Sequence, residues 1–577
     1  MASAPVQNAV QGVSSTSVAT VAEAFLWLLK SRGIDKFFIN AGTDFAPLVE
    51  AYARFSDGSP LFPEVVIAGH ENVSMGMAHG AYLMNGQPQA VMFHVNVGTA
   101  NAVCAALNAR AEGVPLLICA GRSPIYEHGK LGARNTRVAW GQEMYDQASL
   151  VREAVKWEYE LRGEAQLADI VDRALIIAQS GPKGPVYLTL PREALAEPLE
   201  SALPADPSVA VPSLAHPDPV AIEKLADALA SAHFPVISSM ASGAEPTSVA
   251  PLAELCQKYA IGYVEEQARY RNLPGSHPYH LGYAVPPVLQ QADAVLFVES
   301  DVPWMDASGS PRPDAFIAQA GQDPNFSRYP VRSHRSDLAI TTDARALFDA
   351  LSAALSKRSH LIPTARHDRM KAMADARRQR EEARRQELRQ STGAITQAEI
   401  SSVLGTFLHD DCVLLNEYWC DPVLVASDRP QSYFYLPASG GLGWGIPAAL
   451  GAKCAAPSKT VIAAVGDGTY MFSNPTACHH ASEKHNLPVL TVVANNTRWD
   501  AVNWTSRLVY PDGNMTGRDW MAVSDLRPSP AYHEIVAASG GLGILVTERA
   551  ELEDAFRRAF HAVEHEGRQA LLNILCE

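Results

Sequence analysis

Short apolar runs alternate with helical segments along almost the whole chain, and the alternation occurs in three rounds. The first round extends from about Ser17 to Arg192, the second from Val220 to about Ala354, and the third from near Ala394 to the end. Apolar runs separated by helices are typical of parallel strands whose crossover helices cover both faces of a sheet. The pattern therefore predicts an α/β protein with three doubly wound domains and mostly parallel sheets.

The expected strands can be read directly from the sequence. They are KFFIN, PEVVIAG, AVMFHV, PLLICAG and GPVYLTLP in the first round, FPVISSM, AIGYVEE, ADAVLFVES and DLAITTD in the second, and DCVLLNE, TVIAAVGDG, VLTVVANN, LGILVTE and ALLNILC in the third.

Two stretches interrupt the alternation and predict the domain boundaries. Six prolines lie between Pro198 and Pro219, as in a surface linker. Residues 366–390 are rich in Arg, Glu and Lys, which favours a solvated linker helix. We expect an N-terminal domain over residues 1–195, a middle domain over 215–355, a charged linker over 356–393 and a C-terminal domain over 394–577.

Charge and cysteine usage exclude several classes of protein. The net charge of −15 leaves no basic excess for a nucleic-acid surface, so small molecules are the expected partners. The eight cysteines form no CxxC motif, which argues against a disulfide framework and a structural zinc site. The first residues lack the features of a signal peptide, and no apolar run is long enough to span a membrane. We expect a cytoplasmic protein that does not bind membranes.

Near the C-terminal end, the stretch from Lys459 to Asn496 has the pattern strand, Gly-Asp-Gly turn, helix, strand, Asn-Asn. Asp467 and Asn496 would follow neighbouring strands, at the edge where an open α/β sheet holds its ligands. A carboxylate and an amide oxygen are ligands that suit Mg²⁺, with its remaining positions left to water and phosphate. A lone GDG is more often a simple turn. The spacing, the strands on both sides and the closing Asn pair favour a magnesium diphosphate site.

This segment resembles the diphosphate-binding motif of thiamine-diphosphate-dependent enzymes, in the branch that includes benzoylformate decarboxylase, pyruvate decarboxylase and acetohydroxyacid synthase. The resemblance covers nearly the whole chain and implies pyrimidine-binding, middle and diphosphate-binding domains in that order. It implies that Asp467, Asn496 and the backbone carbonyl of Arg498 bind the metal. It also implies that the cofactor contacts Gly468, Thr469 and Tyr418. No flavin motif is evident between Ala250 and Asp343, so flavin is not expected.

Glu71 follows the run PEVVIAG and opens a helical segment. An acid there could simply stabilise a helix N-terminus. The family pattern of a glutamate followed by small residues and a tyrosine is similar to Glu71, Ala78, Gly80, Ala81 and Tyr82. This resemblance implies that Glu71 hydrogen-bonds N1′ of the aminopyrimidine and so activates the cofactor.

The glycine-rich segment Tyr433 to Gly451 lacks the arrangement of a dinucleotide fingerprint. It resembles the family's aminopyrimidine loop instead. By that match the carbonyl of Gly440 would accept a hydrogen bond from the 4′-amino group. Leu442 would be the apolar wedge that bends the cofactor.

Two further residues are candidates for proton transfer. The segment around His94 is similar to the one that carries a catalytic histidine in benzoylformate decarboxylase, although a histidine at a strand end is often structural. The segment WGQE around Gln142 resembles a motif of acetohydroxyacid synthases whose glutamine points toward the reactive carbon of the cofactor; a surface glutamine is the simpler interpretation. Thr43 and Asp44 are a further candidate pair, and Asn96, Gly98, Thr99 and Asn101 could line the same cleft. The paired His479 and His480 are expected to be structural or surface groups.

Together these features imply a thiamine-diphosphate and Mg²⁺-dependent decarboxylase, carboligase or lyase acting on a 2-oxo acid or related acyl donor through a C2-ylide and an enamine. An acetolactate synthase-like carboligase without flavin is one alternative. A non-catalytic cofactor-binding regulatory or assembly subunit is another. Many relatives have smaller residues where this sequence has Trp499 and Trp504. The resemblance therefore does not identify the small-molecule carbonyl substrate. The resemblance also implies a homodimer or homotetramer with active sites at the subunit interface, and closed homo-oligomers are common in general.

Overall fold

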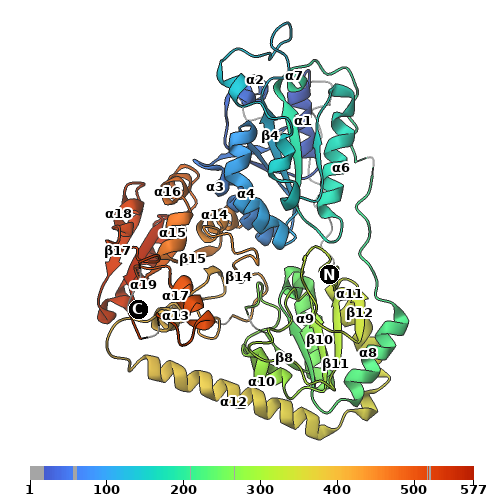
Figure 1. Cartoon of the computed structure of the whole chain (residues 1–577), viewed down its shortest axis with the longest axis vertical. Helices are drawn as coiled ribbons and strands as arrows, with labels where there is room; N and C mark the ends of the chain where they lie inside the picture. The colour runs from blue at the N-terminus through green and yellow to red at the C-terminus, as the bar shows by residue number, and fades with distance from the viewer. Residues whose placement is uncertain are drawn as a thin grey trace. The chain divides into compact units, whose positions relative to one another are not determined.

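The structure, a computed structural model, describes residues 18–55, 61–207, 209–265, 267–425, 427–515, 517–518 and 522–577. These residues contain three six-stranded sheets, in which all strand pairings are parallel (Figure 1). The predicted α/β class with three parallel sheets is confirmed. The chain divides into two compact units, of which the first ends at Pro212 and also includes Pro437–Ala455. The second unit consists of Ser213–Leu436 and Ala456–Glu577.

The first unit is built on a sheet with the strand order β2-β1-β3-β4-β6-β5. Its strands are β1 (Lys36–Ile39), β2 (Glu64–Ile67), β3 (Gln89–Phe93), β4 (Leu116–Arg122), β5 (Glu158–Glu160) and β6 (Val186–Pro191). All five apolar runs expected here are strands. The sixth strand, β5, has the sequence EYE, which carries no apolar pattern for a prediction.

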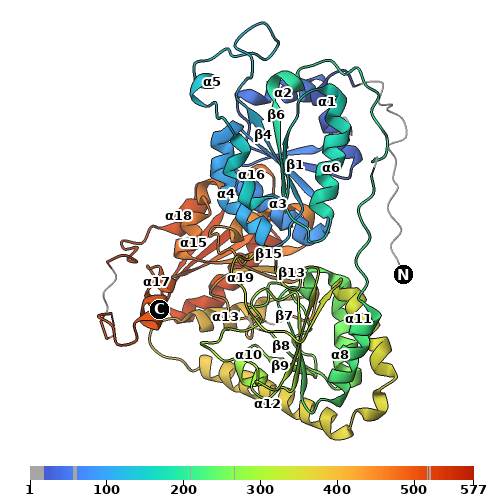
Figure 2. The ribbon, with the colours of Figure 1, turned by 45° about the vertical axis from the view of Figure 1, so that its right-hand side comes forward.

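Helices cover this sheet, and two of them follow strands that are neighbours in it. The helices are α1 (Val21–Ser31), α2 (Ala46–Arg54), α3 (Glu71–Asn85), α4 (Val95–Ala111), α5 (Val138–Gly141), α6 (Leu167–Gln179) and α7 (Arg192–Leu195). Helices α1 and α6 lie side by side (Figures 1 and 2). Because β1 pairs directly with β3, the residues that follow these two strands meet at one edge of the sheet.

Helix α14 (Gly445–Ala455) packs closely on α3 within the first unit. A Cβ on Gly80 would lie 1.9 Å from the backbone oxygen of Ala448, and one on Gly451 would lie 1.8 Å from that of Met77. The two backbones therefore approach as closely as only glycine permits. This packing fixes the glycine-rich loop that precedes α14.

The second unit begins with a sheet ordered β12-β11-β10-β7-β8-β9. Its strands are β7 (Pro235–Ser239), β8 (Gly262–Val264), β9 (His280–Gly282), β10 (Ala294–Val298), β11 (Phe316–Gly321) and β12 (Leu338–Thr341). Its helices are α8 (Pro219–Ser231), α9 (Val249–Tyr259), α10 (Val285–Leu289) and α11 (Ala344–Ser356). Figure 2 shows α8 and α11 side by side along this sheet. The four expected strands are present, and β9 and β11 are additional.

The charged stretch expected as a solvated linker forms α12 (Thr364–Leu388). One face of it is buried, with Arg366, Met370, Ala374 and Arg377. The guanidinium of Arg366 donates to the carbonyls of Leu229, Ala230, Ala232 and Tyr259. A single side chain thus caps the carboxyl ends of α8 and α9. The helix is anchored on the middle sheet and is not solvated all round.

The third sheet has the order β14-β13-β15-β16-β18-β17. Its strands are β13 (Cys412–Glu417), β14 (Tyr433–Tyr435), β15 (Thr460–Gly466), β16 (Leu490–Asn495), β17 (Leu542–Val546) and β18 (Ala570–Leu575). Its helices within the second unit are α13 (Gln397–Phe407), α15 (Asp467–Phe472), α16 (Pro475–Lys484), α17 (Asp500–Val509), α18 (Tyr532–Ala537) and α19 (Leu552–Glu564). All five expected strands are present. Strands β15 and β16 are neighbours, so Asp467 and Asn496 follow adjacent strands.

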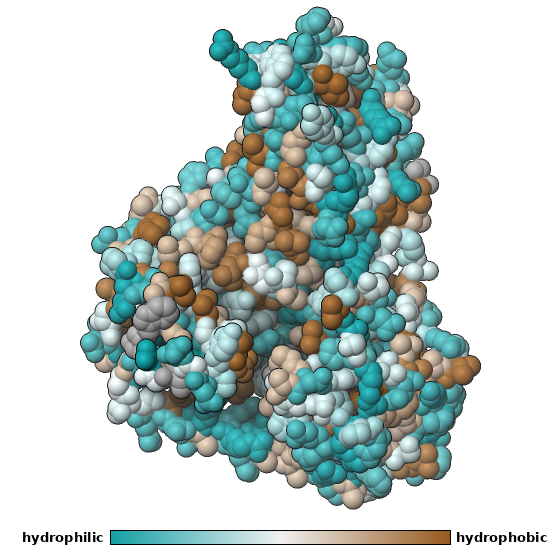
Figure 3. Space-filling view, in the orientation of Figure 1, coloured by the Kyte–Doolittle hydropathy of each residue, from teal (hydrophilic) through white to brown (hydrophobic). Residues whose placement is uncertain are grey.

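The surface shown in Figure 3 is mostly hydrophilic, with apolar residues interspersed among polar ones. Among the helices in the described ranges, none combines the length and the apolar character required to cross a bilayer.

Candidate functional site

In the first unit, Asp44 and His94 form a close pair at the carboxyl ends of β1 and β3. Oδ1 of Asp44 lies 2.6 Å from Nδ1 of His94, and Oδ2 accepts a hydrogen bond from the N–H of Val95 at 3.2 Å. Asp44 is buried. The hydrogen bond to Asp44 raises the pKa of His94 above its ordinary value, with partial burial opposing the shift and the charges of Asp44 and Glu71 adding to it. His94 is therefore disposed to carry a proton near neutral pH.

Two glycines make room for this pair. A Cβ on Gly121, in β4, would lie 1.7 Å from Oδ2 of Asp44, and one on Gly42 would lie 2.1 Å from Nδ1 of His94. Val95, which follows the histidine, has φ 34°, a conformation that costs energy for a β-branched residue. The hydrogen bond from Val95 to Asp44 holds this strained turn in place.

Gln142 lies at the other nitrogen of the His94 ring. Its Nε2 is 3.2 Å from Nε2 of His94. A carboxylate can only accept, so Nδ1–H of His94 donates to Asp44; in the neutral ring Nε2 then accepts from the Gln142 amide. Both residues line a small pocket together with Thr43, Arg122 and Ser123. The predicted pair His94 and Gln142 is thus brought together by the fold.

Glu71 is the first residue of α3, and its side chain contacts the beginning of α4. Asn101 donates from Nδ2 to Oε2 of Glu71 at 3.0 Å. A Cβ on Gly98 would lie 3.1 Å from Oε1, so the glycine leaves space for the carboxylate. Glu71 is at the helix N-terminus, as the simpler interpretation held, and it is also oriented by a partner on α4.

In the second unit, Asp467 is a buried carboxylate without a cationic partner among the described residues. Oδ1 accepts a hydrogen bond from the N–H of Gly468 at 2.8 Å. Oδ2 is buried, and no group of the described residues lies in hydrogen-bonding geometry to it. Burial raises the pKa of Asp467 to about 6, and the backbone N–H groups of Gly468, Thr497 and Arg498 oppose the shift. The uncompensated oxygen is an unused ligand for a cation.

The loop after β16 turns back toward this carboxylate. Oδ1 of Asn496 accepts from the N–H of Arg498 at 3.2 Å, and Thr497 has φ 56°. The backbone N–H groups of Thr497 and Arg498 lie near enough to Asp467 to lower the pKa of its carboxyl. The three predicted metal ligands, Asp467, Asn496 and Arg498, are therefore close together after β15 and β16. A carboxylate, an amide and a backbone carbonyl form an oxygen donor set that fits a divalent ion.

The predicted diphosphate contacts lie beside Asp467. Gly468 packs against the indole of Trp499, where a Cβ would lie 2.6 Å from Cδ1. The hydroxyl of Thr469 donates to the carbonyl of Gly466 at 2.8 Å. Tyr418 follows β13 with φ 85° and a half-exposed side chain. The first two are therefore in contact with the metal-ligand cluster, and Tyr418 lies at the end of the neighbouring strand.

Comparison with known proteins identifies the family to which these residues belong. Residues 19–150 match the family described as "Thiamine pyrophosphate enzyme, N-terminal TPP binding domain", and residues 417–574 match the corresponding C-terminal TPP binding domain. The chain is a thiamine pyrophosphate enzyme. The resemblance drawn from the sequence is confirmed.

Relatives within the thiamine pyrophosphate enzymes differ in the reactions for which they are named. The chain is 28% identical to the sulfoacetaldehyde acetyltransferase of Rhodobacter capsulatus, over 96% of this chain and 94% of that one. It is 26% identical to the benzoylformate decarboxylase of Pseudomonas aeruginosa, over 94% and 97% of the two chains. The structure of a 4-hydroxybenzoylformate decarboxylase of Rhodococcus jostii has a TM-score of 0.75 at 21% identity, covering 97% of this chain and 99% of that one. That likeness concerns the fold.

Each unit, taken by itself, carries residues that suit one end of thiamine pyrophosphate. Glu71 and the loop with Gly440 and Leu442 are in the first unit, and Gly440 has φ 65°, which glycine tolerates. The metal cluster with the orphaned Oδ2 of Asp467 would take the ion that accompanies the diphosphate.

Some residues of this thiamine pyrophosphate enzyme were not assigned roles from the sequence. Asn108 forms hydrogen bonds with Gly441, in the loop before α14. Its spacing of seven residues from Asn101 places both side chains on one face of a helix, and this spacing could have suggested a shared role. His479 is a buried structural group, as expected, since its ring nitrogens bond Tyr470 and Gln569.

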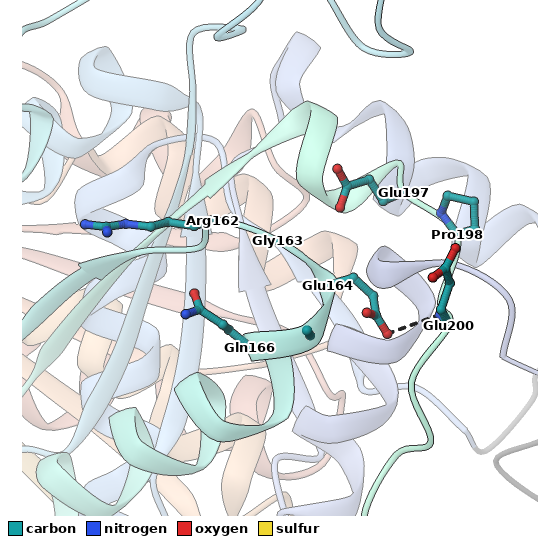
Figure 4. Close-up of a pocket in the computed structure, with 8 residues that line it drawn as sticks. Arg162, Gly163, Glu164, Gln166, Glu197, Pro198 and Glu200 are labelled. Carbon is teal, nitrogen blue, oxygen red and sulfur yellow. Dashed lines mark hydrogen bonds between the residues drawn. The ribbon is translucent and has the colours of Figure 1, made fainter.

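A larger surface hollow in the first unit contains none of the candidate residues (Figure 4). Its Glu164 accepts hydrogen bonds from the backbone N–H groups of Glu200, at 3.1 Å, and Ser201, and these bonds lower its pKa against the effect of burial. The carboxylate therefore binds the segment that follows Pro198 to the turn between β5 and α6.

Proposed function

We propose that this thiamine pyrophosphate enzyme decarboxylates a 2-oxo acid with His94 as the proton donor. The observation that carries the proposal is the chain Asp44, His94, Gln142, in which a buried carboxylate holds one ring nitrogen at 2.6 Å and an amide contacts the other at 3.2 Å. The Asp44 carboxylate stabilises the imidazolium form of His94, whose Nε2–H suits proton delivery in a decarboxylation. In that form the amide of Gln142 would present its oxygen to Nε2–H, because an amide nitrogen cannot accept.

The chain's own residues would divide the work with the cofactor. Bound thiamine pyrophosphate supplies a nucleophilic carbon and an electron sink. Glu71 would hold the aminopyrimidine at N1′, with Asn101 orienting its carboxylate. His94 would give a proton from Nε2, and Gln142 would orient either the ring or a substrate oxygen. The hydroxyl of Ser123, buried in the same cavity with no hydrogen-bond partner among the described residues, is a donor for that oxygen.

We further propose Mg²⁺ as the metal, bound by Asp467, Asn496 and the carbonyl of Arg498. Its support is the pairing of β15 with β16 and the uncompensated Oδ2 of Asp467. Mg²⁺ usually binds one or two carboxylate or carbonyl groups together with phosphate oxygens. Gly468 and Thr469 would then lie against the diphosphate, with Tyr418 near it. Flavin is not part of the proposal.

Acyl transfer or carboligation is the second candidate function. Gln142 favours it, because its amide lies 3.2 Å from Nε2 of His94 and would bind the carbonyl of an acceptor there. The acetyltransferase relative at 28% identity also favours it. A non-catalytic regulatory or assembly subunit is the alternative from another class. A subunit that only binds the cofactor would also use Asp467, but it would not need the Asp44, His94 and Gln142 contacts, which suit proton transfer and argue against this alternative.

Product analysis separates these functions. The enzyme loaded with thiamine pyrophosphate and Mg²⁺ is incubated with pyruvate or benzoylformate, alone and with an aldehyde, and separately with sulfoacetaldehyde. Aldehyde release supports decarboxylation, and acyloin, acetolactate or acetyl transfer supports the second candidate. Glu71→Ala should remain folded and lose nearly all turnover. If no substrate reacts and C2–H exchange of the bound cofactor is no faster than in solution, the non-catalytic alternative holds.

The homodimer or homotetramer with shared active sites and the cytoplasmic location stay predictions. Sedimentation of the loaded enzyme and localisation of a tagged chain would test them.

A further inference from the structure

One face of helix α4 contacts both of the elements proposed to hold the aminopyrimidine. Asn101 and Asn108 are seven residues apart, which is two helical turns, so their side chains emerge on the same face about 10 Å from each other. Asn101 donates to Glu71 at 3.0 Å. Asn108 bonds the loop that carries Gly440 and Leu442. A single rigid element thus connects the two contacts.

The side chain of Asn108 is buried and makes three hydrogen bonds with this loop. Its Nδ2 donates to the carbonyl of Gly441 at 2.8 Å, while its Oδ1 accepts from the N–H of Gly441 at 3.1 Å and from the hydroxyl of Ser439 at 2.6 Å. One turn further along α4, Glu112 accepts from the N–H of Ala438 at 3.1 Å. These contacts fix the loop at Ala438, Ser439 and Gly441, on either side of Gly440.

The backbone of the loop lies close against α4 at Gly441. A Cβ on Gly441 would lie 2.5 Å from Oδ1 of Asn108 and 2.9 Å from Sγ of Cys104, which is on the same helix. Gly440 and Gly443 have φ of 65° and 87°, left-handed conformations that glycine adopts readily and other residues rarely do. Asn108 binds the backbone at the centre of this loop, directly between Gly440 and Leu442.

We infer that Asn108 is a positioning residue that sets the loop of Gly440 and Leu442 in register with Glu71, through their common attachment to α4. This inference rests on the proposed function, since the contacts of Gly440, Leu442 and Glu71 with the aminopyrimidine belong to that proposal. Asn108 itself touches no reacting atom. Asn108 would keep the carbonyl of Gly440 and the carboxylate of Glu71 at a fixed separation, on the two sides of the aminopyrimidine ring.

The test compares Asn108→Ala and Ser439→Ala with the wild-type holoenzyme. Leu107→Ala is the matched control, because Leu107 is the adjacent residue of α4 and is 42% exposed. Three readouts are taken: the affinity for thiamine pyrophosphate with saturating Mg²⁺ from tryptophan fluorescence, the C2–H exchange rate of the saturated cofactor from acid-quench NMR, and the thermal midpoint.

Asn108→Ala should weaken cofactor binding at least tenfold and slow C2–H exchange by a similar factor, since three hydrogen bonds are lost. Ser439→Ala, which removes one bond and leaves α4 unchanged, should give a smaller effect in the same direction, even if Asn108→Ala folds poorly. Leu107→Ala should match the wild type. The inference is overturned if both loop-contact variants exchange C2–H at the wild-type rate at saturation, with only the thermal midpoint lowered. A wild type that binds the cofactor without accelerating exchange would contradict the proposed function instead.

Discussion

Both carboxylate oxygens of Asp44 bind the turn that carries His94: Oδ1 lies 2.6 Å from Nδ1 of the ring, and Oδ2 accepts from the N–H of Val95 at 3.2 Å. The first contact fixes the protonation of the ring and the second fixes the backbone that presents it. Nε2 of His94 is consequently the only ring nitrogen that can exchange a proton with a substrate. This relationship gives the proposed reaction a specific dependence on pH.

Asp44→Asn should shift the pH dependence of turnover toward lower pH. The hydrogen bond with Asp44 raises the pKa of His94, so the protonated form persists above its usual range and activity that needs it falls only as pH rises through the raised pKa. Without the opposite charge of Asp44, the pKa of His94 falls back toward its ordinary value. The descending limb of kcat against pH should therefore move to lower pH.

The control for this experiment is Asp35→Asn. Asp35 belongs to the same unit, and its exposed carboxylate pairs only with Lys30 among the ion pairs of the described residues. Its pH profile should equal that of the wild type. An unchanged profile in Asp44→Asn would show that the proton donor is another group.

Gly121→Ala should disable the site without unfolding the protein. The added Cβ would lie 1.7 Å from Oδ2 and 2.5 Å from Cγ of Asp44, so the carboxylate has to leave its place. A misplacement of about 1 Å in a catalytic group can lower the rate roughly a hundredfold. We expect kcat to fall by about that factor while the circular dichroism spectrum is preserved.

Gly163→Ala is the matched substitution, since nothing lies within 4 Å of the Cβ position there and φ is in the extended range. It should leave kcat unchanged. Equal activity of the two alanine variants would mean that the position of Asp44 does not matter to the reaction.

The strands of this protein could largely be predicted from its sequence because buried parallel strands are continuous apolar runs. The strands that were not expected are short or polar: EYE in β5, HLG in β9 and YFY in β14. β11 is longer, but Gln319 and Gly321 interrupt its apolar pattern. Their strand conformation depends on pairing with neighbours, which local sequence does not encode.

The candidate site was predictable where a motif coincides with a strand end, as for Glu71, His94, Asp467 and Asn496. The pairing of Asp44 with His94 joins residues 50 positions apart, and that of Asn108 with Gly441 joins residues 333 positions apart. Such contacts follow from the strand order and from the packing of α14 on α3. Neither the strand order nor this helix packing can be predicted from a single sequence.

Gly80→Ala should destabilise the first unit through the contact of α3 with α14. The new methyl group would lie 1.9 Å from the carbonyl oxygen of Ala448, which is backbone and cannot rotate away. Overpacking of this kind costs about 1–3 kcal/mol. We expect the thermal midpoint of the cofactor-free protein to fall by several degrees, whereas Gly163→Ala leaves it unchanged. A wild-type midpoint in Gly80→Ala would indicate that the helices separate at no cost.

The metal site should make the stability of the cofactor-free protein depend on pH. Burial raises the pKa of Asp467 to about 6 from its ordinary value near 4. The folded protein therefore binds this proton more tightly than the unfolded chain does. Its contribution to stability is complete below about pH 4 and is lost as pH rises through 6, at a cost of about 2–3 kcal/mol.

Asp467→Asn should abolish this dependence and, with it, metal binding. Asparagine has no charge to bury, so the cofactor-free variant should melt at a higher temperature than the wild type at pH 8 and at a similar temperature at pH 4, in EDTA. With Mg²⁺ and thiamine pyrophosphate the order at pH 8 should reverse, because only the wild type gains the stabilisation that a bound ligand confers. Asp512→Asn, an exposed carboxylate of the same unit, serves as the control for removal of one negative charge. If the variant gains as much from Mg²⁺ and cofactor as the wild type does, Asp467 is not a metal ligand.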